Sequence, residues 1–195
     1  RKILNDQEGP GALFIYNEGF FSLINCSFIN NIGNAKGGAV LMNIKNIVSF
    51  DDARFIGNSV DAKDDSAFGG ALYFDQNIED NWDPLPFSIR NCYFQDNFIK
   101  QDESFGGAIY IKFVSDKYLA LNSPFTIEGC LFINRSSSEA GGAIASGEYH
   151  WHGTRASGDL IIKYCSFIEC QARYGGGIFC FDGGSGRDEE TNITN

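Results

Sequence analysis

A double glycine recurs along this chain at nearly constant intervals, and an apolar segment follows each copy. The pairs begin at residues 37, 69, 106, 141 and 175, so the intervals between them are 32, 37, 35 and 34 residues. Pro10-Gly11 is an imperfect earlier copy. A repeat of this length is typical of small supersecondary units that stack on one another and share a continuous core. The repeat therefore favours a single solenoid domain.

The residues after each double glycine alternate between apolar and other side chains. One apolar column contains Leu13, Val40, Leu72, Ile109, Ile144 and Ile178. Two residues later, a second column contains Ile15, Met42, Phe74, Ile111, Ser146 and Cys180. A period of two with one apolar face indicates a β-strand.

A second segment stands between the double glycines and recurs as FSLINCSF at 21–28 and FSIRNCYF at 87–94. In its Phe-x-Ile part, apolar residues alternate with other residues. The cysteine of the Cys-x-Phe part then follows three residues after the last apolar residue of that alternation, and not two. This step breaks the alternation and indicates a corner between two short strands. Its last position is always phenylalanine: Phe28, Phe55, Phe94, Phe132 and Phe167. Each repeat therefore predicts three strands, namely the Gly-Gly, Phe-x-Ile and Cys-x-Phe strands.

Three short strands and three corners per repeat, stacked in register, describe a parallel β-helix. We predict an all-β, right-handed parallel β-helix of about six rungs with three short strands per rung, the hand following from the usual chirality of parallel crossovers. The domain is expected to cover residues 1–181. Residues 182–195 are expected to form a polar C-terminal tail and not a cap, because they are rich in glycine and charge.

Two polar columns fit this alignment. Ile24, Asp51, Arg90, Glu128 and Lys163 fall at the corner that follows the Phe-x-Ile strand. From the second rung on, the sign of the charge alternates, so opposite charges are expected to stack outside, ~4.8 Å apart. Asn31, Asn58 and Asn97 occupy a second column. We expect them to form an internal amide ladder at a left-handed corner.

The phrases FINN…GGAV, FIGN…GGAL and FQDN…GGAI occur at the first three rungs. They resemble the repeats of polymorphic outer-membrane protein type surface adhesins, over roughly residues 10–180. The resemblance implies a right-handed, pectin-lyase-like β-helix exposed at a cell surface. The later rungs depart from the pattern, because FINR stands at 132–135 and FIEC at 167–170.

Six cysteines provide a test of the alignment, and their spacing is not that of a zinc site. Stacking places Cys92, Cys130 and Cys165 on adjacent rungs, within the distance that a disulfide accepts. Ala53 separates Cys26 from this group. The column can therefore hold one disulfide, Cys92–Cys130 or Cys130–Cys165, or it can stay reduced as a row of small buried side chains. Cys170 and Cys180 could pair near the last rung.

Charge and composition exclude several functions. The formal net charge of -10 disfavours nucleic-acid partners. No apolar stretch approaches the ~20 residues of a membrane helix, so no membrane insertion of this segment is expected. Asp51-Asp52, the pair His150 and His152, and the acidic stretches 61–65 and 101–105 are weak candidates for catalysis or metal binding. We predict no catalytic residue, metal or cofactor.

Surface features carry the remaining functional signal. Asn25, Asn134 and Asn192 begin Asn-x-Ser/Thr acceptor sequences and are candidates for glycosylation. Three rungs carry long insertions at 75–86, 112–124 and 147–159, at the same corner of the solenoid. These insertions contain the candidate contact residues for glycans or protein partners: Trp82, Tyr118, Tyr149 and Trp151.

The combined features favour an extracellular or cell-surface structural or adhesive glycoprotein that is not an enzyme. Its expected partners are glycans or surface proteins, and its open ends suggest end-to-end self-association or a segment of a surface fibre. The alternatives are a carbohydrate-active enzyme, either a polysaccharide lyase or a glycosidase, and a carbohydrate-binding module. Each of them could use the same fold.

Overall fold

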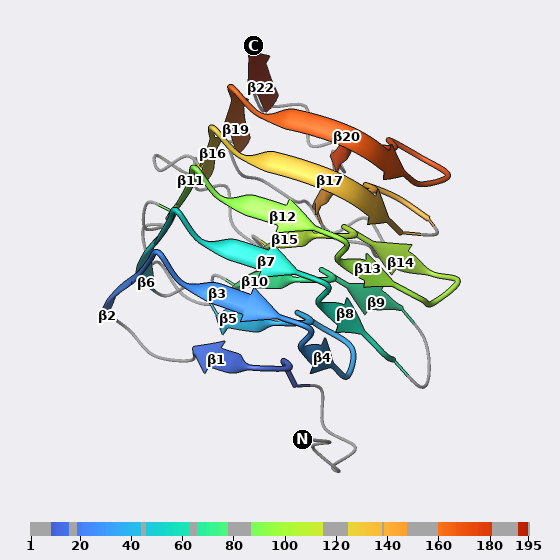
Figure 1. The fold of residues 1–195 in the computed structure, drawn as a ribbon, viewed down its shortest axis with the longest axis horizontal. Coiled ribbons are helices and arrows are strands. Elements are labelled where there is room, and N and C mark those ends of the chain that lie inside the picture. Colours follow the sequence, from blue (N-terminus) through green and yellow to red (C-terminus); the bar gives the residue numbers. More distant parts are fainter. Residues whose placement is uncertain are drawn as a thin grey trace.

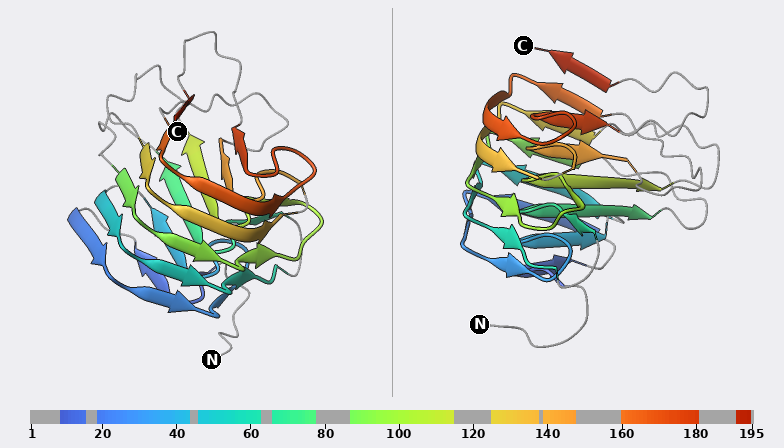
Figure 2. Two further views of the ribbon diagram at one scale, coloured as in Figure 1. Left: turned by 45° about the horizontal axis from the view of Figure 1, so that its top comes forward. Right: turned by 90° about the vertical axis from the view of Figure 1, so that its right-hand side faces the viewer.

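The structure is a computed structural model that describes residues 9–15, 19–43, 46–62, 66–77, 87–114, 125–137, 139–147, 160–180 and 191–194. These residues form a parallel β-helix, as predicted (Figure 1). Every strand pair among them is parallel, and strands of successive rungs stack one above the other (Figure 2). The hand of the coil stays a prediction.

Three sheets run along the solenoid and correspond to the three predicted strands. Sheet A is the Gly-Gly sheet: β1 (Leu13–Ile15), β5 (Val40–Asn43), β10 (Leu72–Asn77), β15 (Ile109–Val114), β18 (Ile144–Ser146) and β21 (Ile178–Cys180). Sheet B is the Phe-x-Ile sheet: β2 (Gly19–Ile24), β6 (Asn46–Asp51), β11 (Phe87–Arg90), β16 (Phe125–Glu128), β19 (Leu160–Lys163) and β22 (Thr191–Thr194).

Sheet C begins with the Cys-x-Phe strands: β3 (Ser27–Ile29), β7 (Arg54–Ile56), β12 (Tyr93–Gln95), β17 (Leu131–Ser136) and β20 (Ser166–Gln171). In the first three rungs, a second short piece follows: β4 (Ile32–Gly33), β8 (Ser59–Val60) and β13 (Phe98–Ile99). A rung is one A, one B and one C strand in chain order. Rungs four and five have unbroken C strands, and these are the rungs in which arginine and cysteine replace the ladder asparagine.

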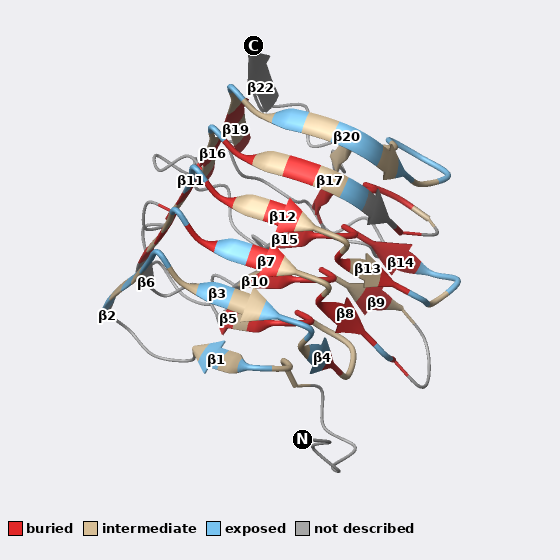
Figure 3. Cartoon of the chain, viewed as in Figure 1, coloured by how far each residue is buried: buried red, intermediate tan, exposed pale blue. Residues whose placement is uncertain are grey.

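The observed register confirms the aligned columns. Leu72 pairs with Val40 and Ile109, and Phe87 pairs with Val48 and Phe125. The five phenylalanines of sheet C form one continuous stack, with ring centroids 4.7–5.1 Å apart and planes within 9° of parallel. Inward side chains of rungs two to four are buried, whereas those of the first and last rungs are only partly covered (Figure 3).

The C-terminal segment differs from the predicted tail. Residues 191–194 form β22, which pairs with β19 as the next strand of sheet B. Ile193 aligns with Ile162, so the sequence Thr-Asn-Ile continues the apolar columns of the Phe-x-Ile strand. The sequence does not predict this strand, because polar threonine and asparagine surround its one large apolar residue.

The links between sheets C and A form structure that the sequence did not predict. In rungs two and three they contain β9 (Ala67–Phe68) and β14 (Ser104–Phe105), which pair with each other. Phe68 and Phe105 pack on the outward face of sheet A against Tyr73 and Tyr110. Residues 104 and 105 are buried, so the end of the acidic stretch 101–105 is part of this packing.

Asn58 and Asn97 form the predicted amide ladder and are fully buried. The side-chain amide of Asn58 donates to Asn97 Oδ1 at 2.8 Å and to Phe28 O at 2.9 Å. Its Oδ1 accepts from the backbone N and the Nδ2 of Asn31, at 3.0 and 2.8 Å. The prediction that the ladder asparagines stand at the left-handed position is wrong. The left-handed residue is the one before the ladder position: Asn30, Gly57, Asp96, Asn134 and Glu169.

Replacing Asn58 by alanine should lower the free energy of unfolding by about 3 kcal/mol, because it removes four hydrogen bonds from a ladder that is buried or partly buried. Asn31→Ala is the matched control, since Asn31 is only partly buried; we expect a loss of about 1 kcal/mol. Urea unfolding followed by circular dichroism measures both. Equal losses would contradict a ladder centred on Asn58.

Candidate functional site

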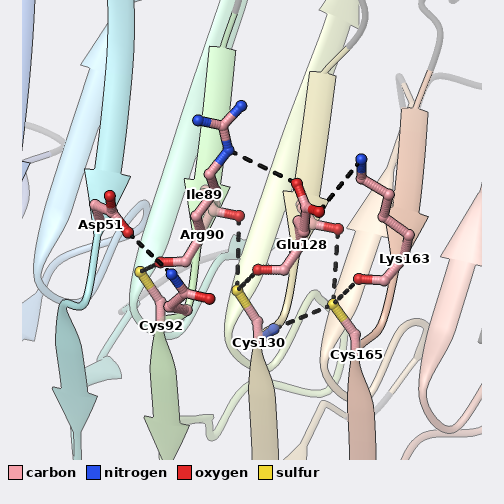
Figure 4. A network of polar contacts seen from close by, with 10 residues as sticks. Asp51, Ile89, Arg90, Cys92, Glu128, Cys130, Lys163 and Cys165 are labelled. Atoms are coloured by element: carbon pink, nitrogen blue, oxygen red, sulfur yellow. Dashed lines mark hydrogen bonds and ion pairs between the residues drawn. The ribbon is translucent and has the colours of Figure 1, made fainter.

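The corner between sheets B and C brings three different columns together (Figure 4). The last residue of β2, β6, β11, β16 and β19 faces outward and belongs to the charge column. The next residue makes the turn with a left-handed backbone: Asn25, Asp52, Asn91, Gly129 and Tyr164, with φ between 52° and 62°. The third residue points inward: Cys26, Ala53, Cys92, Cys130 and Cys165. We call this set the B–C corner.

The left-handed residue explains the three-residue step in the sequence. Asparagine, aspartate and glycine adopt this conformation at low cost, and they occupy four of the five positions. Tyr164 is the exception, because it is bulky, left-handed and 65% exposed. The repeat alignment does not predict this left-handed column, although its asparagine and aspartate residues are a signal that could identify it.

The outward column confirms the predicted alternation of charge. Glu128 forms an ion pair on each side. Arg90 Nε lies 3.7 Å from its Oε2, and Lys163 Nζ lies 3.3 Å from its Oε1. One rung earlier, Asn91 Nδ2 donates to Asp51 Oδ1 at 3.3 Å. These groups are partly or largely exposed, so each ion pair contributes at most about 1 kcal/mol. The Asp51 carboxylate is thus one member of a surface ladder.

The inward column is a row of stacked thiols. Cys92 and Cys130 are 1% and 2% exposed, whereas Cys165 is half-buried. Each thiol lies near the carbonyl oxygen two residues before it, at 3.1 Å for Cys92 and 3.4 Å for the other two. Cys130 Sγ also lies 3.7 Å from Ile89 O, and Cys165 Sγ lies 3.6 Å from Ile127 O. The two sulfur atoms therefore point back towards the preceding rung (Figure 4).

Cys130 and Cys165 differ in acidity, and each affects the pKa of the other. Hydrogen bonding from the Cys130 thiol holds the pKa of Cys165 below its ordinary value, against the opposing effect of burial. The backbone N–H of Cys130 adds to this effect from 3.4 Å. Contacts with Cys165 and Cys92, together with burial, raise the pKa of Cys130. Cys165 is consequently the member of the pair that becomes a thiolate first.

All six cysteines are thiols in the structure, so the inward column is reduced. Cys170 occupies the ladder column on β20, with its Sγ 3.6 Å from Ile168 O. Cys180 lies on β21 of sheet A, opposite Ser146. The pairing of Cys170 with Cys180 that the sequence allowed is not present.

Two glycosylation candidates are exposed at corners. Asn25 is the left-handed residue of the first B–C corner. Asn134 is left-handed in β17, and its Nδ2 donates to Asp96 Oδ1 at 2.6 Å. Asn192 lies in β22 opposite Ile161.

The contact candidates Trp82, Tyr118, Tyr149 and Trp151 lie outside the described residues, as do His150 and His152. The strands β10 and β15 continue to Asn77 and Val114, so two of the three insertions begin later than predicted. The predicted cluster of aromatic loops stays a prediction.

Other candidate sites are weak. Lys100, Gln101, Asp102 and Glu103 line an open hollow of about 350 Å³. There, Gln101 Nε2 donates to Ala62 O at 2.6 Å, and Ser66 Oγ lies 3.3 Å from Glu103 Oε2. Within the described ranges, no group of three or more His, Cys, Asp or Glu side chains is placed to hold a metal ion. The same ranges contain no helix long and apolar enough to cross a membrane.

No family model, curated protein or solved structure matches this chain.

Proposed function

We propose that this chain is a structural or adhesive module of an extracellular or cell-surface glycoprotein, and that it associates end to end with further copies of itself. The repeated phrase builds the scaffold, and its side chains are used in packing and in ladders between rungs. The resemblance of the FxxN and Gly-Gly-Ala phrases to surface-adhesin repeats supports this setting.

The observation that carries the proposal is a ring of exposed apolar side chains on the first rung. It consists of Phe14, Phe20, Ile24, Ile29 and Ile32, which are 54–76% exposed. Later rungs place charged or polar residues in two of the same columns, with Asp51 opposite Ile24 and Ser59 opposite Ile32. Removing exposed apolar side chains such as these from water favours association with another chain.

The ends of the sheets suit such a contact. β1 and β21 are the two edges of sheet A, and β2 and β22 are the two edges of sheet B, over the part of the chain that the structure describes. An edge strand offers backbone N–H and C=O groups to a strand of another chain. A second copy could therefore extend the sheets and cover the apolar ring at once.

Asn25 is the attachment point that the geometry favours for a glycan. Its side chain is exposed at an outward turn, and Ser27, the hydroxyl residue of the acceptor sequence, is also exposed. Because Asn25 lies beside Ile24 on the first rung, a glycan there would lie next to the proposed contact surface.

The test uses native material isolated from the cell surface or the medium. We expect peptide mapping to find an N-linked glycan on Asn25, and electron microscopy to show filaments or end-to-end pairs. Dispersed monomers at all concentrations would contradict self-association, and an unmodified Asn25 in that material would contradict its role as an acceptor.

Two variants separate these readouts. Asn25→Asp removes the acceptor but keeps a residue that adopts the left-handed conformation, as Asp52 does in the next rung. We expect it to remove the glycan and leave the fold unchanged. Phe20→Glu places a charge in the apolar ring at a 76% exposed position, and we expect it to prevent association without unfolding the chain.

A further inference from the structure

We propose that Cys165 is an oxidisable thiol that forms a disulfide with Cys130 when the chain meets a hydroperoxide, while Cys92 stays reduced. The proposal is independent of the proposed surface function, because it depends only on the thiols of the B–C corner. It selects one of the two disulfides that stacking allows.

Access distinguishes Cys165 from the other two thiols of the group. Cys165 precedes β20, which is the last strand of sheet C in the part of the chain that the structure describes. It is half-buried, whereas Cys92 and Cys130 are 1% and 2% exposed inside the solenoid. A small oxidant in solution therefore reaches the sulfur of Cys165 before it reaches either of the others.

The surroundings of Cys165 also favour its reactive form. Its Sγ accepts from the backbone N–H of Cys130 at 3.4 Å, and the neighbouring Cys130 side chain acts in the same direction. Both contacts stabilise a negative charge on sulfur and lower the pKa of Cys165. The thiolate is the nucleophile in thiol oxidation. Exposure and hydrogen bonding thus select the same residue.

Cys130 is placed to complete the bond. Ser166 N donates to Cys130 O at 3.0 Å, which fixes the two rungs in register at this corner. Residues stacked in this way lie ~4.8 Å apart, within the Cα separation that a disulfide accepts. The Cys130 Sγ now points to Ile89 O at 3.7 Å, so forming the bond requires this side chain to turn towards Cys165.

The chemistry proceeds in two steps. The Cys165 thiolate attacks one peroxide oxygen; an S–O bond forms, the O–O bond breaks, and the leaving hydroxide takes a proton from solvent. This gives a sulfenic acid on Cys165. Cys130 sulfur then attacks Cys165 sulfur; the S–S bond forms, the S–O bond breaks, and the departing hydroxide takes the Cys130 thiol proton. Two thiols are oxidised and one peroxide is reduced to two waters.

Cys26 is a matched internal control. It occupies the same column at the other end of the solenoid, is also half-buried, and has its Sγ 3.4 Å from Ile24 O. The next rung carries Ala53 in place of a thiol. Cys26 therefore shares the exposure and corner of Cys165 but lacks the neighbouring thiol that would activate it and complete a disulfide.

The experiment treats the reduced, purified chain with hydrogen peroxide at a low molar ratio, blocks the remaining thiols with maleimide, and maps the peptides. We expect a Cys130–Cys165 disulfide, and loss of the Cys165 thiol about tenfold faster than that of Cys26. Alkylation of Cys165 should also persist to lower pH than that of a free cysteine, because its pKa is lowered. A Cys92–Cys130 disulfide, or equal rates for Cys165 and Cys26, would overturn the proposal.

Alanine variants follow the precedent of Ala53 in the same column. Cys130→Ala removes a side chain that lowers the pKa of Cys165 but keeps the backbone N–H of residue 130. In this variant Cys165 should therefore react more slowly and stop at the sulfenic acid, which dimedone traps as an adduct on that residue. In Cys92→Ala, the disulfide should form as in the unaltered chain. Absence of a dimedone adduct on Cys165 in the first variant, or loss of the disulfide in the second, would contradict the assigned roles.

Discussion

Replacing Gly70 by alanine should lower the free energy of unfolding by about 4 kcal/mol, because the backbone of the next rung already occupies the position of the new methyl group. A Cβ atom on Gly70 would overlap Gly107 O and would lie 3.0 Å from the backbone N and O of Phe98. Inter-rung hydrogen bonds hold the surrounding backbone, from Gly107 N to Gly141 O and from Phe98 N to Asn58 O, so the strain cannot relax locally. Guanidinium unfolding followed by circular dichroism measures the loss.

Gly177→Ala is the matched control for this prediction. Gly177 follows the last double glycine and stands where other rungs have alanine: Ala39, Ala71, Ala108 and Ala143. A Cβ atom there would meet only the Phe167 side chain at 3.6 Å, an ordinary contact. We expect no loss, or a gain of about 0.5 kcal/mol from the smaller freedom of the unfolded chain. Equal destabilisation by both variants would show that the close approach of the rungs is not the cause.

Phe94→Ala should cost about 4 kcal/mol, since it empties the centre of the phenylalanine stack. Phe94 is fully buried, and its ring centroid lies 4.9 Å from that of Phe55 and 4.7 Å from that of Phe132. Removing the ring leaves a cavity whose walls are fixed by rungs above and below. Thermal and denaturant unfolding should both show the loss.

Phe28→Ala is the comparison for Phe94→Ala, because Phe28 lies at the end of the same stack. Phe28 is half-buried, and its ring contacts one neighbour of the stack, Phe55, at 5.1 Å. Because less apolar area is removed from the core and solvent can fill the space, Phe28→Ala should cost about 2 kcal/mol. A loss as large as that of Phe94→Ala would mean that burial does not set the contribution of each ring.

The inward columns were predictable from sequence because equivalent residues of successive rungs stack directly on one another. A single shift of register would move phenylalanine or leucine to the outside, so alternation and the double glycines were enough to align Val40 with Leu72 and Phe55 with Phe94. The predicted stacking of the cysteines and of the charge column follows from the same alignment.

The features that the sequence did not predict depend on backbone angles and on links of variable length. The left-handed residue before Asn31 or Asn58 carries no single residue type, since asparagine, glycine, aspartate and glutamate all occupy its column. The C-to-A links differ in length from rung to rung, so their pairing in β9 and β14 leaves no periodic signal. The outward Tyr73 and Tyr110 are buried by these links, and alternation alone would have placed them in solvent.

The asparagine ladder has a consequence for how the solenoid is held together along its length. Its hydrogen bonds tie the first three rungs and stop at Asn97, because later rungs replace the amide. The adjacent thiols begin on that third rung, with Cys92, and continue to the fifth. Side-chain amides thus connect the N-terminal rungs of the solenoid, while its C-terminal rungs contain thiols that oxidation could crosslink. The strength of its far end would then vary with the redox state of its surroundings.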